Sequence, residues 1–583
     1  MKFRSYAKPY RASFILGPLC MIVEVIGEVL MPALLAAIIN RGTAGTLTVP
    51  QSVGYAALMI LIALTMMAGG VGGAYFGARA SVGFATDLRR DAYARVQSFS
   101  FANIDHFSTG SLVTRLTNDI QQLQNFINML LRLCLRAPGM LIGALIMAIR
   151  LQPTLSLVLA VSIPSLLLCV LFIVRMGFPR FSRMQTRIDS LNSTVQENIT
   201  NVRVVKSFVR EEHEEKKFRR ANAELRRAGM SAMQVMIFMS PVMTVFMNLT
   251  TLAVLWFGSS LVLRSGMEIG GLSAFLTYVT QILSSLMMVT MMLMTSSRAL
   301  ASARRVREVM EEPLDIREED ADEGLRVSRG KIEFRDVSFR YYKNSEEAVL
   351  RNINLVIEPG STVGIIGSTG CGKTTLVSLI PRLYDTDSGQ VLVDGEDVRR
   401  YSLYHLREGV GMVLQKNVLF SGTILDNLRW GDENASPEEV RAAARRAQAD
   451  GFVSSFAEGY DTELEQGGTN VSGGQKQRLC IARALLKKPK ILILDDSTSA
   501  VDTATEAMIR RAFREELRDS TKLIIAQRIS SVRDADLIVV MNEGSISGVG
   551  THEELLAANT DYREIYESQT DTKGGKADGS KES

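Results

Sequence analysis

The stretch STVGIIGSTGCGKTTLVSLI, residues 361–380, has the order of a strand, a glycine-rich loop and a helix. Its centre fits G-x-x-x-x-G-K-[ST], a loop whose backbone N–H groups surround phosphate oxygens. The loop and the residue after it are Gly367, Ser368, Thr369, Gly370, Cys371, Gly372, Lys373, Thr374 and Thr375. This pattern predicts a nucleoside triphosphate site in an α/β domain.

The same loop predicts a magnesium site. Lys373 should reach the terminal phosphates, and the Thr374 hydroxyl should bind Mg²⁺. A second buried-strand pattern, ILIL at 491–494, ends at Asp495, which can hold the Mg²⁺ shell from the opposite side. We therefore expect ATP and Mg²⁺ as cofactors.

Strand and helix patterns surround this loop and predict the extent of the domain. They alternate from 331 to about 570, as in a layered α/β domain. The acidic run 311–330, EEPLDIREEDADEGLRVSRG, lacks apolar periodicity and is predicted to be a linker. The polar end, 571–583, is predicted to be a disordered tail.

The first part of the chain, 1–310, reads as an all-α membrane domain. Six apolar runs are long enough, or nearly so, for the ~20 residues that cross a bilayer: 13–40, 53–79, 126–149, 154–174, 235–263 and 270–296. Helix-compatible sequence continues past two of them, after 79 and through 175–230, and turns charged. This predicts helices that leave the bilayer and extend into the cytoplasm.

Basic residues predict the orientation. They precede the first run and fill the loops after the second and fourth, whereas 41–52 and 264–269 carry one arginine each. By the positive-inside rule both termini and the nucleotide-binding domain are cytoplasmic. Because one six-span part is fused to one such domain without a targeting extension, we expect a multi-pass protein of a bacterial inner membrane.

The composition of the chain limits the classes of ligand and partner that we expect it to bind. The net charge of +4 on 583 residues gives no case for nucleic acid, and the five scattered cysteines predict neither a metal cluster nor a disulfide framework. Within the first span, Glu24 and Glu28 lie on one helical face and are candidates for a substrate cavity. An interior pair packed against water or a polar neighbour is the equal alternative. Methionine-rich fifth and sixth spans favour apolar or amphipathic ligands, or serve as flexible filler.

A second anion site follows from NVSGGQKQRLCIARALL, 470–486. Ser472, Gly473 and Gly474 stand at the start of a helix, where free N–H groups bind anions. Since the first loop already holds one phosphate group, this site needs a second nucleotide or a second chain. The sequence here closely resembles the ATP-binding cassette (ABC) exporters of multidrug type, over essentially its whole length. The matching motifs are GSTGCGKT, VSGGQ at 471–475, which ends with Gln475, and SAVD at 499–502.

The resemblance implies a half-transporter with six spans and one nucleotide-binding domain. Two such chains would sandwich two ATPs, each bound by the phosphate loop of one chain and the VSGGQ signature of the other. Gln415 matches the family's Q-loop glutamine, which also serves the metal, and Tyr341 matches the aromatic that stacks on adenine. Short helices near 101–107 and 205–212 should dock the membrane helices onto these domains.

Two positions depart from the family pattern. The acid after Asp495 is usually Glu, which polarises the attacking water, but this chain has Asp496. Losing one methylene retracts the carboxylate by about 1.5 Å, and misplacement near 1 Å can cost ~10²-fold in rate. The family's switch histidine falls in IIAQRIS, 524–530, where this chain has Gln527. An amide cannot take up a proton near neutrality.

This chain thus combines two non-consensus catalytic residues, Asp496 and Gln527, with an intact VSGGQ signature. That combination resembles the degenerate-site subunit of heterodimeric exporters. We expect a partner half-transporter with Glu and His at the two positions and a weakened signature. The substrates would be amphipathic or hydrophobic compounds, such as drugs, lipids or peptides, exported from the cytoplasm or inner leaflet. The alternatives are a homodimeric exporter with slow hydrolysis, or a membrane-anchored ATP-dependent sensor.

Overall fold

The computed structural model describes residues 3–264, 266–342, 345, 347–496 and 503–574. The chain forms two compact units. The first comprises Met1–Gln97 and Thr109–Glu312, and the second comprises Ser98–Ser108 and Pro313–Ser583. The short loop 98–108 therefore belongs with the second unit, although it interrupts the first in sequence.

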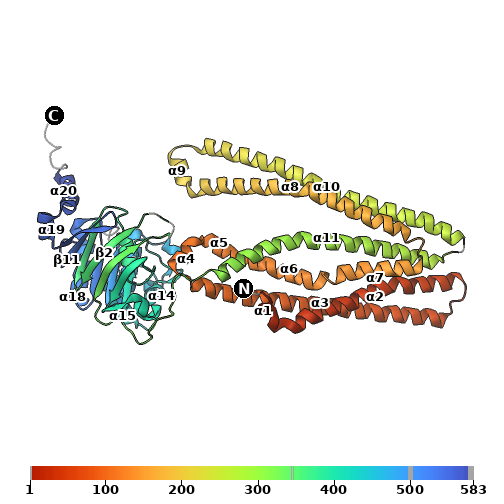
Figure 1. Ribbon diagram of the computed structural model, residues 1–583, viewed down its shortest axis with the longest axis horizontal. Helices are drawn as coiled ribbons and strands as arrows, with labels where there is room; N and C mark the ends of the chain where they lie inside the picture. The colour runs from red at the N-terminus through yellow and green to blue at the C-terminus, as the bar shows by residue number, and fades with distance from the viewer. Residues whose placement is uncertain (1–2, 265, 343–344, 346, 497–502, 575–583) are drawn as a thin grey trace. The chain divides into compact units, whose positions relative to one another are not determined.

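The described part of the first unit is helical (Figure 1). Its elements are α1 (Arg4–Ala7), η1 (Lys8–Tyr10), α2 (Arg11–Thr43), α3 (Val49–Gln97), α5 (Thr109–Thr114), the π-helical η2 (Arg115–Asp119), α6 (Ile120–Leu133), α7 (Arg136–Leu151), α8 (Leu157–Thr200), α9 (Val202–Ser207), α10 (Glu211–Leu263) and α11 (Ile269–Glu311). In the described residues, six helical stretches are long and apolar enough to cross a membrane: Arg4–Thr43, Val49–Gln97, Thr109–Leu151, Leu157–Thr200, Glu211–Leu263 and Ile269–Val289. The six predicted spans are confirmed.

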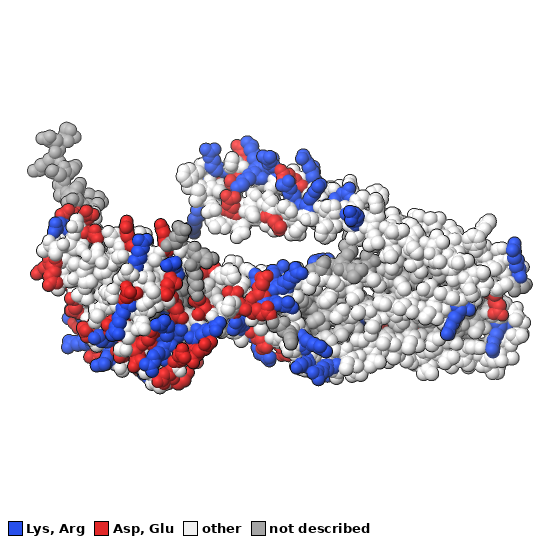
Figure 2. Space-filling model, in the orientation of Figure 1, with Lys and Arg blue, Asp and Glu red and all other residues white. Residues whose placement is uncertain are grey.

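Several of these helices are much longer than a bilayer needs. The 53 residues of α10 extend about 80 Å at 1.5 Å per residue, against a hydrocarbon core of about 30 Å. Figure 2 shows Lys, Arg, Asp and Glu gathered over the ends of α8 and α10 beside α9, while the middle of the helical bundle is almost free of them. The predicted charged extensions are confirmed.

The helices of this unit pack against one another through small and apolar residues. α2 packs along α3, and α11 packs against α2 and α7, with Phe275 and Tyr278 fully buried in the shared core. A Cβ on Gly69 would lie 2.8 Å from the carbonyl oxygen of Cys20, so the missing side chain lets α2 and α3 approach closely. α8 packs mainly against α10 (Figure 1).

The second unit is a layered α/β domain, as predicted. A six-stranded sheet has the order β12-β11-β3-β10-β9-β6, and a four-stranded antiparallel sheet has the order β2-β1-β4-β5. The strands are β1 (Ile332–Phe339), β2 (Leu350–Ile357), β3 (Thr362–Gly367), β4 (Ser388–Val393), β5 (Glu396–Asp397), β6 (Val410–Val413), β7 (Gly422–Thr423), β8 (Glu463–Leu464), β9 (Ile491–Asp495), β10 (Thr521–Ile525), β11 (Leu537–Asn542) and β12 (Ser545–Gly550).

The helices of this unit pack in two core regions. They are α4 (Phe101–His106), α12 (Lys373–Ser378), α13 (Leu403–Gly409), α14 (Ile424–Arg429), α15 (Pro437–Arg446), α16 (Asp450–Val453), α17 (Gly473–Leu486), α18 (Thr503–Glu516), α19 (His552–Ala558) and α20 (Thr560–Gly574), with 3₁₀ turns η3 (Val398–Arg400), η4 (Gly459–Asp461), η5 (Gln466–Gly468) and η6 (Ile529–Ser531). One core lies between the two sheets around Phe334 and Ile365, and the other joins α14, α15 and α17 to the larger sheet.

The parallel strands determine where a site can form. β3, β10, β9 and β6 are neighbours in the large sheet and run parallel. The segments that follow their carboxyl ends therefore meet at one edge of the sheet, the usual place for ligands in such folds.

Both ends of the second unit differ from the sequence-based prediction. The segment predicted as a linker is folded after Glu311. Ile316 is 6% exposed, Arg382 donates a hydrogen bond to the Arg317 carbonyl (3.1 Å), and Asp322 forms a β-bridge with Tyr401. A few apolar side chains inside an acidic run were enough to dock it. At the other end α20 continues to Gly574, four residues into the predicted tail, and 575–583 lie outside the described residues.

Candidate functional site

The phosphate loop joins β3 to α12. Gly370 and Gly372 have φ values of +86° and +97°, and a Cβ on Gly372 would lie 2.8 Å from Leu350, so this loop requires glycine there. The Lys373 ammonium donates to the carbonyl oxygens of Gly367 (2.8 Å) and Ser368 (2.7 Å). The loop thus curls around the lysine, with its amides available to surround an anion.

The predicted metal ligands lie together. Thr374 Oγ1, at the start of α12, donates to Asp495 Oδ1 (3.0 Å), at the end of β9. Asp495 is 2% exposed, and burial raises the pKa of its carboxyl, the Thr374 hydrogen bond lowers it, and the neighbouring Asp496 raises it. A hydroxyl and a carboxylate are hard oxygen donors of the kind Mg²⁺ prefers, so the residues present fit the ion.

Asp496 is held in a special conformation. Its φ is +47°, in the left-handed region that non-glycine residues seldom adopt, and its N–H donates to the Ile525 carbonyl (3.0 Å). Gln527 Nε2 donates to Asp496 Oδ2 (2.9 Å), and Gln415 also donates to this carboxylate. Burial raises the pKa of Asp496, while the Lys373 charge and the two amides oppose that shift. Two amide donors therefore hydrogen-bond to the carboxylate that would have to orient water.

The backbone around Gln527 is hydrogen-bonded to α20. Gln569 of α20 donates to the Gln527 carbonyl (2.8 Å), and its own Oε1 accepts the N–H of Ile529 (2.9 Å). These bonds tie the segment after β10 to α20, while β10 itself pairs with β9. The side chain at position 527 therefore faces Asp496 because of the backbone around it.

Tyr341 lies just after β1 and is 40% exposed. Its hydroxyl hydrogen-bonds with Thr375 Oγ1 (2.8 Å), and its ring is roughly perpendicular to that of Phe339, with 5.0 Å between centroids. A partly exposed aromatic ring held at its hydroxyl is suited to stack on a base.

The VSGGQ signature forms a capped helix terminus. Ser472 is the N-cap of α17: its Oγ accepts the N–H of Gln475 (3.3 Å), and Gln475 Oε1 accepts the N–H of Ser472 (2.9 Å). A Cβ on Gly473 would meet no atom within 4 Å. The N-terminus of α17 is therefore capped but open, as a surface that binds an anion from another molecule requires.

The fold thus brings the predicted residues of the phosphate loop, Asp495, Asp496, Gln415 and Gln527 to one sheet edge. The SAVD motif at 499–502 lies outside the described residues. Cys371 is buried, with its sulfur 3.7 Å from Lys373 Nζ. Sequence reasoning missed Tyr384, which contacts Tyr341, and Gln569, because nothing in a linear pattern marks a side chain that acts by contact alone.

Short helices lie at or near the two segments predicted to dock the membrane helices, while the docking itself stays a prediction. α4, at Phe101–His106, falls within the predicted 101–107 and packs inside the second unit. α9, at Val202–Ser207, begins three residues before the predicted 205–212, and it has no buried residue.

In the membrane unit, Glu24 and Glu28 share a partner. Arg136 Nη2 lies 3.2 Å from Glu24 Oε1 and 3.4 Å from Glu28 Oε2. Glu24 Oε2, Arg136 Nε and the Oε1 of Gln281 are buried without a hydrogen-bond partner in the described residues. The glutamates therefore belong to a polar cluster of α2, α7 and α11 that holds two carboxyl groups and one guanidinium.

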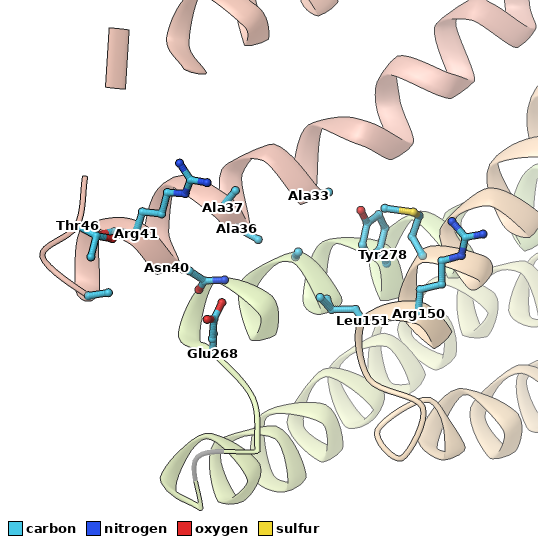
Figure 3. Close-up of a pocket in the computed structure, with 13 residues that line it drawn as sticks. Ala33, Ala36, Ala37, Asn40, Arg41, Thr46, Arg150, Leu151, Glu268 and Tyr278 are labelled. Atoms are coloured by element: carbon cyan, nitrogen blue, oxygen red, sulfur yellow. The ribbon is translucent and has the colours of Figure 1, made fainter. Parts of the chain in front are cut away.

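A cavity of about 510 Å³ lies at the other ends of these helices (Figure 3). It is lined from α2, α7 and α11, with Asn40 beside Glu268, while Arg41 and Arg150 extend from separate helices. Asn40 Oδ1 accepts the N–H of Gly270 (2.6 Å). Glu24 and Glu28 are not among its lining residues, so their place in a substrate cavity stays a prediction.

Comparisons with known proteins match both units. A family model described as the ABC transporter transmembrane region matches residues 14–286, and one described as ABC transporter matches 350–499. The ABC transporter ATP-binding protein YfiB of Bacillus subtilis (strain 168) is 40% identical over 580 residues, 99% of this chain and 100% of that protein. The ATP-dependent lipid A-core flippase of Syntrophus aciditrophicus (strain SB) is 35% identical over 488 residues, 83% of this chain and 80% of the flippase.

Among solved structures, one of a bacterial Atm1-family ABC exporter with ATP bound is similar in fold. The TM-score is 0.78 at 24% identity, over 97% of this chain and 98% of that one.

Proposed function

The chain belongs to the ABC transporters, and from this premise we propose that it is the degenerate-site subunit of a heterodimeric exporter. Family membership makes it an ATP-driven exporter, an ATPase-coupled multi-pass membrane protein with a cytoplasmic nucleotide-binding domain. The proposal concerns the division of work between its two ATP sites.

One contact carries the proposal: the 2.9 Å hydrogen bond from Gln527 Nε2 to Asp496 Oδ2. The acid is one methylene shorter than the family's glutamate, and a neutral amide replaces the histidine. The amide donates to the oxygen that would otherwise accept a proton from water. The P-loop site of this chain would therefore hold ATP and hydrolyse it slowly.

The signature supports the other half of the proposal. Ser472 caps an open helix terminus, so this chain would complete an ATP site on the partner's P-loop. The partner would bring the glutamate and histidine that this chain lacks. At the P-loop of this chain, Thr374 and Asp495 would hold Mg²⁺, with Gln415 as a further ligand. The ion would neutralise charge on the phosphates.

The substrate class we propose is amphipathic or hydrophobic compounds, lipids in particular. The flippase relative is named for lipid A-core. Met233 and Met236 of α10 are more than half exposed in the described chain, and methionine surfaces adapt to varied apolar ligands. The Glu24–Glu28–Arg136 cluster, with two carboxyl groups for one guanidinium, would lie near this path and favour cationic head groups over anionic ones.

The test begins with purification of the native complex and mass spectrometry of its second subunit. We expect a different half-transporter with Glu and His at the two positions. After incubation with Mg-ATP and washing, the nucleotide retained by this chain should be ATP, since its own site turns over slowly.

Lys373→Ala should remove that retained ATP, because the loop loses its charge on the phosphates. Lys488→Ala, an exposed lysine paired with Glu439 in the same domain, is the matched control and should retain it. A complex of two identical chains that retains only ADP would contradict the proposal and favour a homodimer with slow hydrolysis.

A further inference from the structure

The cavity of about 510 Å³ lies where α2 and α7 end and α11 begins (Figure 3). α3 ends at Gln97, next to the loop 98–108 that belongs with the cytoplasmic nucleotide-binding domain, so its start and the end of α2 are on the other side of the membrane. α11 ends at Glu311, just before the chain enters the same domain, so its start is on that side as well. The cavity therefore lies at the membrane face opposite the cytoplasm, which we call the far face.

The charged residues of the cavity are at the depth of lipid head groups. Arg41 directly follows the apolar run 13–40, and Arg150 directly follows the apolar run 126–149. Such a run crosses the hydrocarbon core, so the first charged residue beyond it lies in the interfacial layer that also holds the phosphates of lipids. Glu268, the N-cap of α11, completes the charged rim of the cavity.

Basic residues are scarce at the far face, as the positive-inside rule expects. The connections there, with the helix ends beside them, carry Arg41, Arg150 and Arg264 and no lysine. Arg41 and Arg150 line the same cavity, although they extend from different helices (Figure 3), whereas Arg264 is not among the lining residues. Two guanidiniums brought to one cavity on a face that has few of them favour a site for an anion over two unrelated interfacial anchors.

Both guanidiniums are available to an anion. In the part of the chain that the structure describes, neither Arg41 nor Arg150 forms an ion pair with an acid. The Arg41 guanidinium lies over the ring of Tyr55 on α3, 5.5 Å from its centroid. A guanidinium over a ring keeps the N–H donors at its edge, and two of these donors match two oxygens of a phosphate. A phosphate would therefore form the ion pairs that the described chain does not supply.

The walls behind the charged rim are apolar. Ala36 and Ala37 follow Ala33 by three and four positions, so their small side chains lie on one side of α2 and leave room between the helices. α7 adds Met147 and Leu151, which are one helical turn apart. The volume is within the ~300–1,000 Å³ that is typical of ligand sites. Apolar walls favour the alkyl part of an amphiphile and add nothing to the binding of a free phosphate ion.

We propose that this cavity is a binding site for a phospholipid of the far leaflet, whose phosphate is bound by Arg41 and Arg150 and whose first acyl carbons lie against the alanines of α2. The site is separate from the polar cluster of Glu24 and Glu28, which are not among its lining residues. It depends neither on the division of work between the two ATP sites nor on which compound is transported.

The test is native mass spectrometry of the full-length complex, released from detergent micelles and titrated with dimyristoyl phosphatidylglycerol. Arg41→Gln and Arg150→Gln should each raise the dissociation constant of the tightest bound lipid about tenfold, the effect expected for one hydrogen bond to a charged group. Arg264→Gln removes the same charge from the same membrane face but outside the cavity, so it is the matched control and should bind the lipid as the wild type does.

Two competitors identify the part of the lipid that is recognised. Dimyristoyl glycerol has the same acyl chains without the phosphate and should bind at least about tenfold more weakly. Inorganic phosphate at about a hundredfold excess should not displace the lipid, because the free ion gains nothing from the apolar walls.

A variant with the opposite sign guards against loss of fold. Glu268→Gln removes a negative charge from the rim and should lower the dissociation constant of phosphatidylglycerol a few-fold. A gain in affinity cannot come from misfolding, so this variant tests the charge argument independently of the two arginines.

Three results would overturn the inference. Equal weakening in Arg264→Gln would show that the charge of the whole far face holds the lipid. Displacement by inorganic phosphate would show that the cavity takes a free anion. Wild-type affinity in both Arg41→Gln and Arg150→Gln would show that no lipid phosphate is bound there.

Discussion

Asp496→Asn is expected to lower the steady-state ATPase of the purified complex only several-fold. A carboxylate retracted by about 1.5 Å has already lost much of its hold on the attacking water, since a misplacement of about 1 Å can cost ~10²-fold, or ~2.7 kcal/mol. In this structure its Oδ2 also accepts an amide hydrogen from Gln527 at 2.9 Å. Removing the charge therefore removes little transition-state stabilisation.

Ser472→Ala should lower the steady-state ATPase of the complex far more than Asp496→Asn does. The Ser472 side chain and the α17 terminus behind it would face the γ-phosphate in the partner's competent site. Loss of one such donor typically costs about 10²–10³-fold in kcat, or ~2.7–4 kcal/mol. The assay is the release of inorganic phosphate by the purified complex at saturating Mg-ATP.

Ser472 also caps a helix, so a control must separate the two effects. Ser436 makes the same capping box with Glu439 at the start of α15, in the same domain. Ser436→Ala should lose a similar capping energy of about 0.5–2 kcal/mol and keep its ATPase. If Asp496→Asn eliminates hydrolysis while Ser472→Ala is tolerated, the assignment is inverted, and Asp496 is a working base.

Two further predictions concern charge. Changing Glu24 and Glu28 together to Gln leaves the positive charge of Arg136 unbalanced within the spans. Transport of cationic compounds in vesicles should therefore fall several-fold, while transport of neutral compounds should change little. Equal loss of transport for both kinds of compound would indicate a packing role for the two glutamates. Asp394 accepts the N–H groups of Ser328, Arg329 and Lys331; burial raises the pKa of its carboxyl, but these bonds outweigh that effect and hold the pKa below its ordinary value of 3.8. A lowered pKa stabilises the fold above pH 3.8, and this contribution is lost as pH falls through the folded-state value. Asp394→Ala should therefore lower the free energy of unfolding of the nucleotide-binding domain by about 1–2 kcal/mol at pH 7, and this deficit should shrink below pH 3.8. A pH-independent deficit in thermal unfolding would contradict this linkage.

The sequence alone determined the parts that depend on neighbours along the chain. Lys373 and the glycines of its loop, the Ser472 cap and the six apolar runs are local patterns, and each is found where the pattern places it. The phosphate loop needs glycine because its φ values are positive, and a span needs apolar side chains because lipid surrounds it. Such requirements act within a few residues and can be read without the fold.

The tertiary structure decided which distant side chains meet. Gln527 reaches Asp496 because β10 lies beside β9 in a parallel sheet, a pairing that neither segment encodes by itself. Arg136 lies at the start of α7, and only helix packing brings it to both glutamates of α2. The contact of Tyr384 with Asp105 spans 279 residues of sequence. Hydrogen bonds and ion pairs act over a few ångströms, so contacts between residues far apart in sequence exist only once the chain has folded.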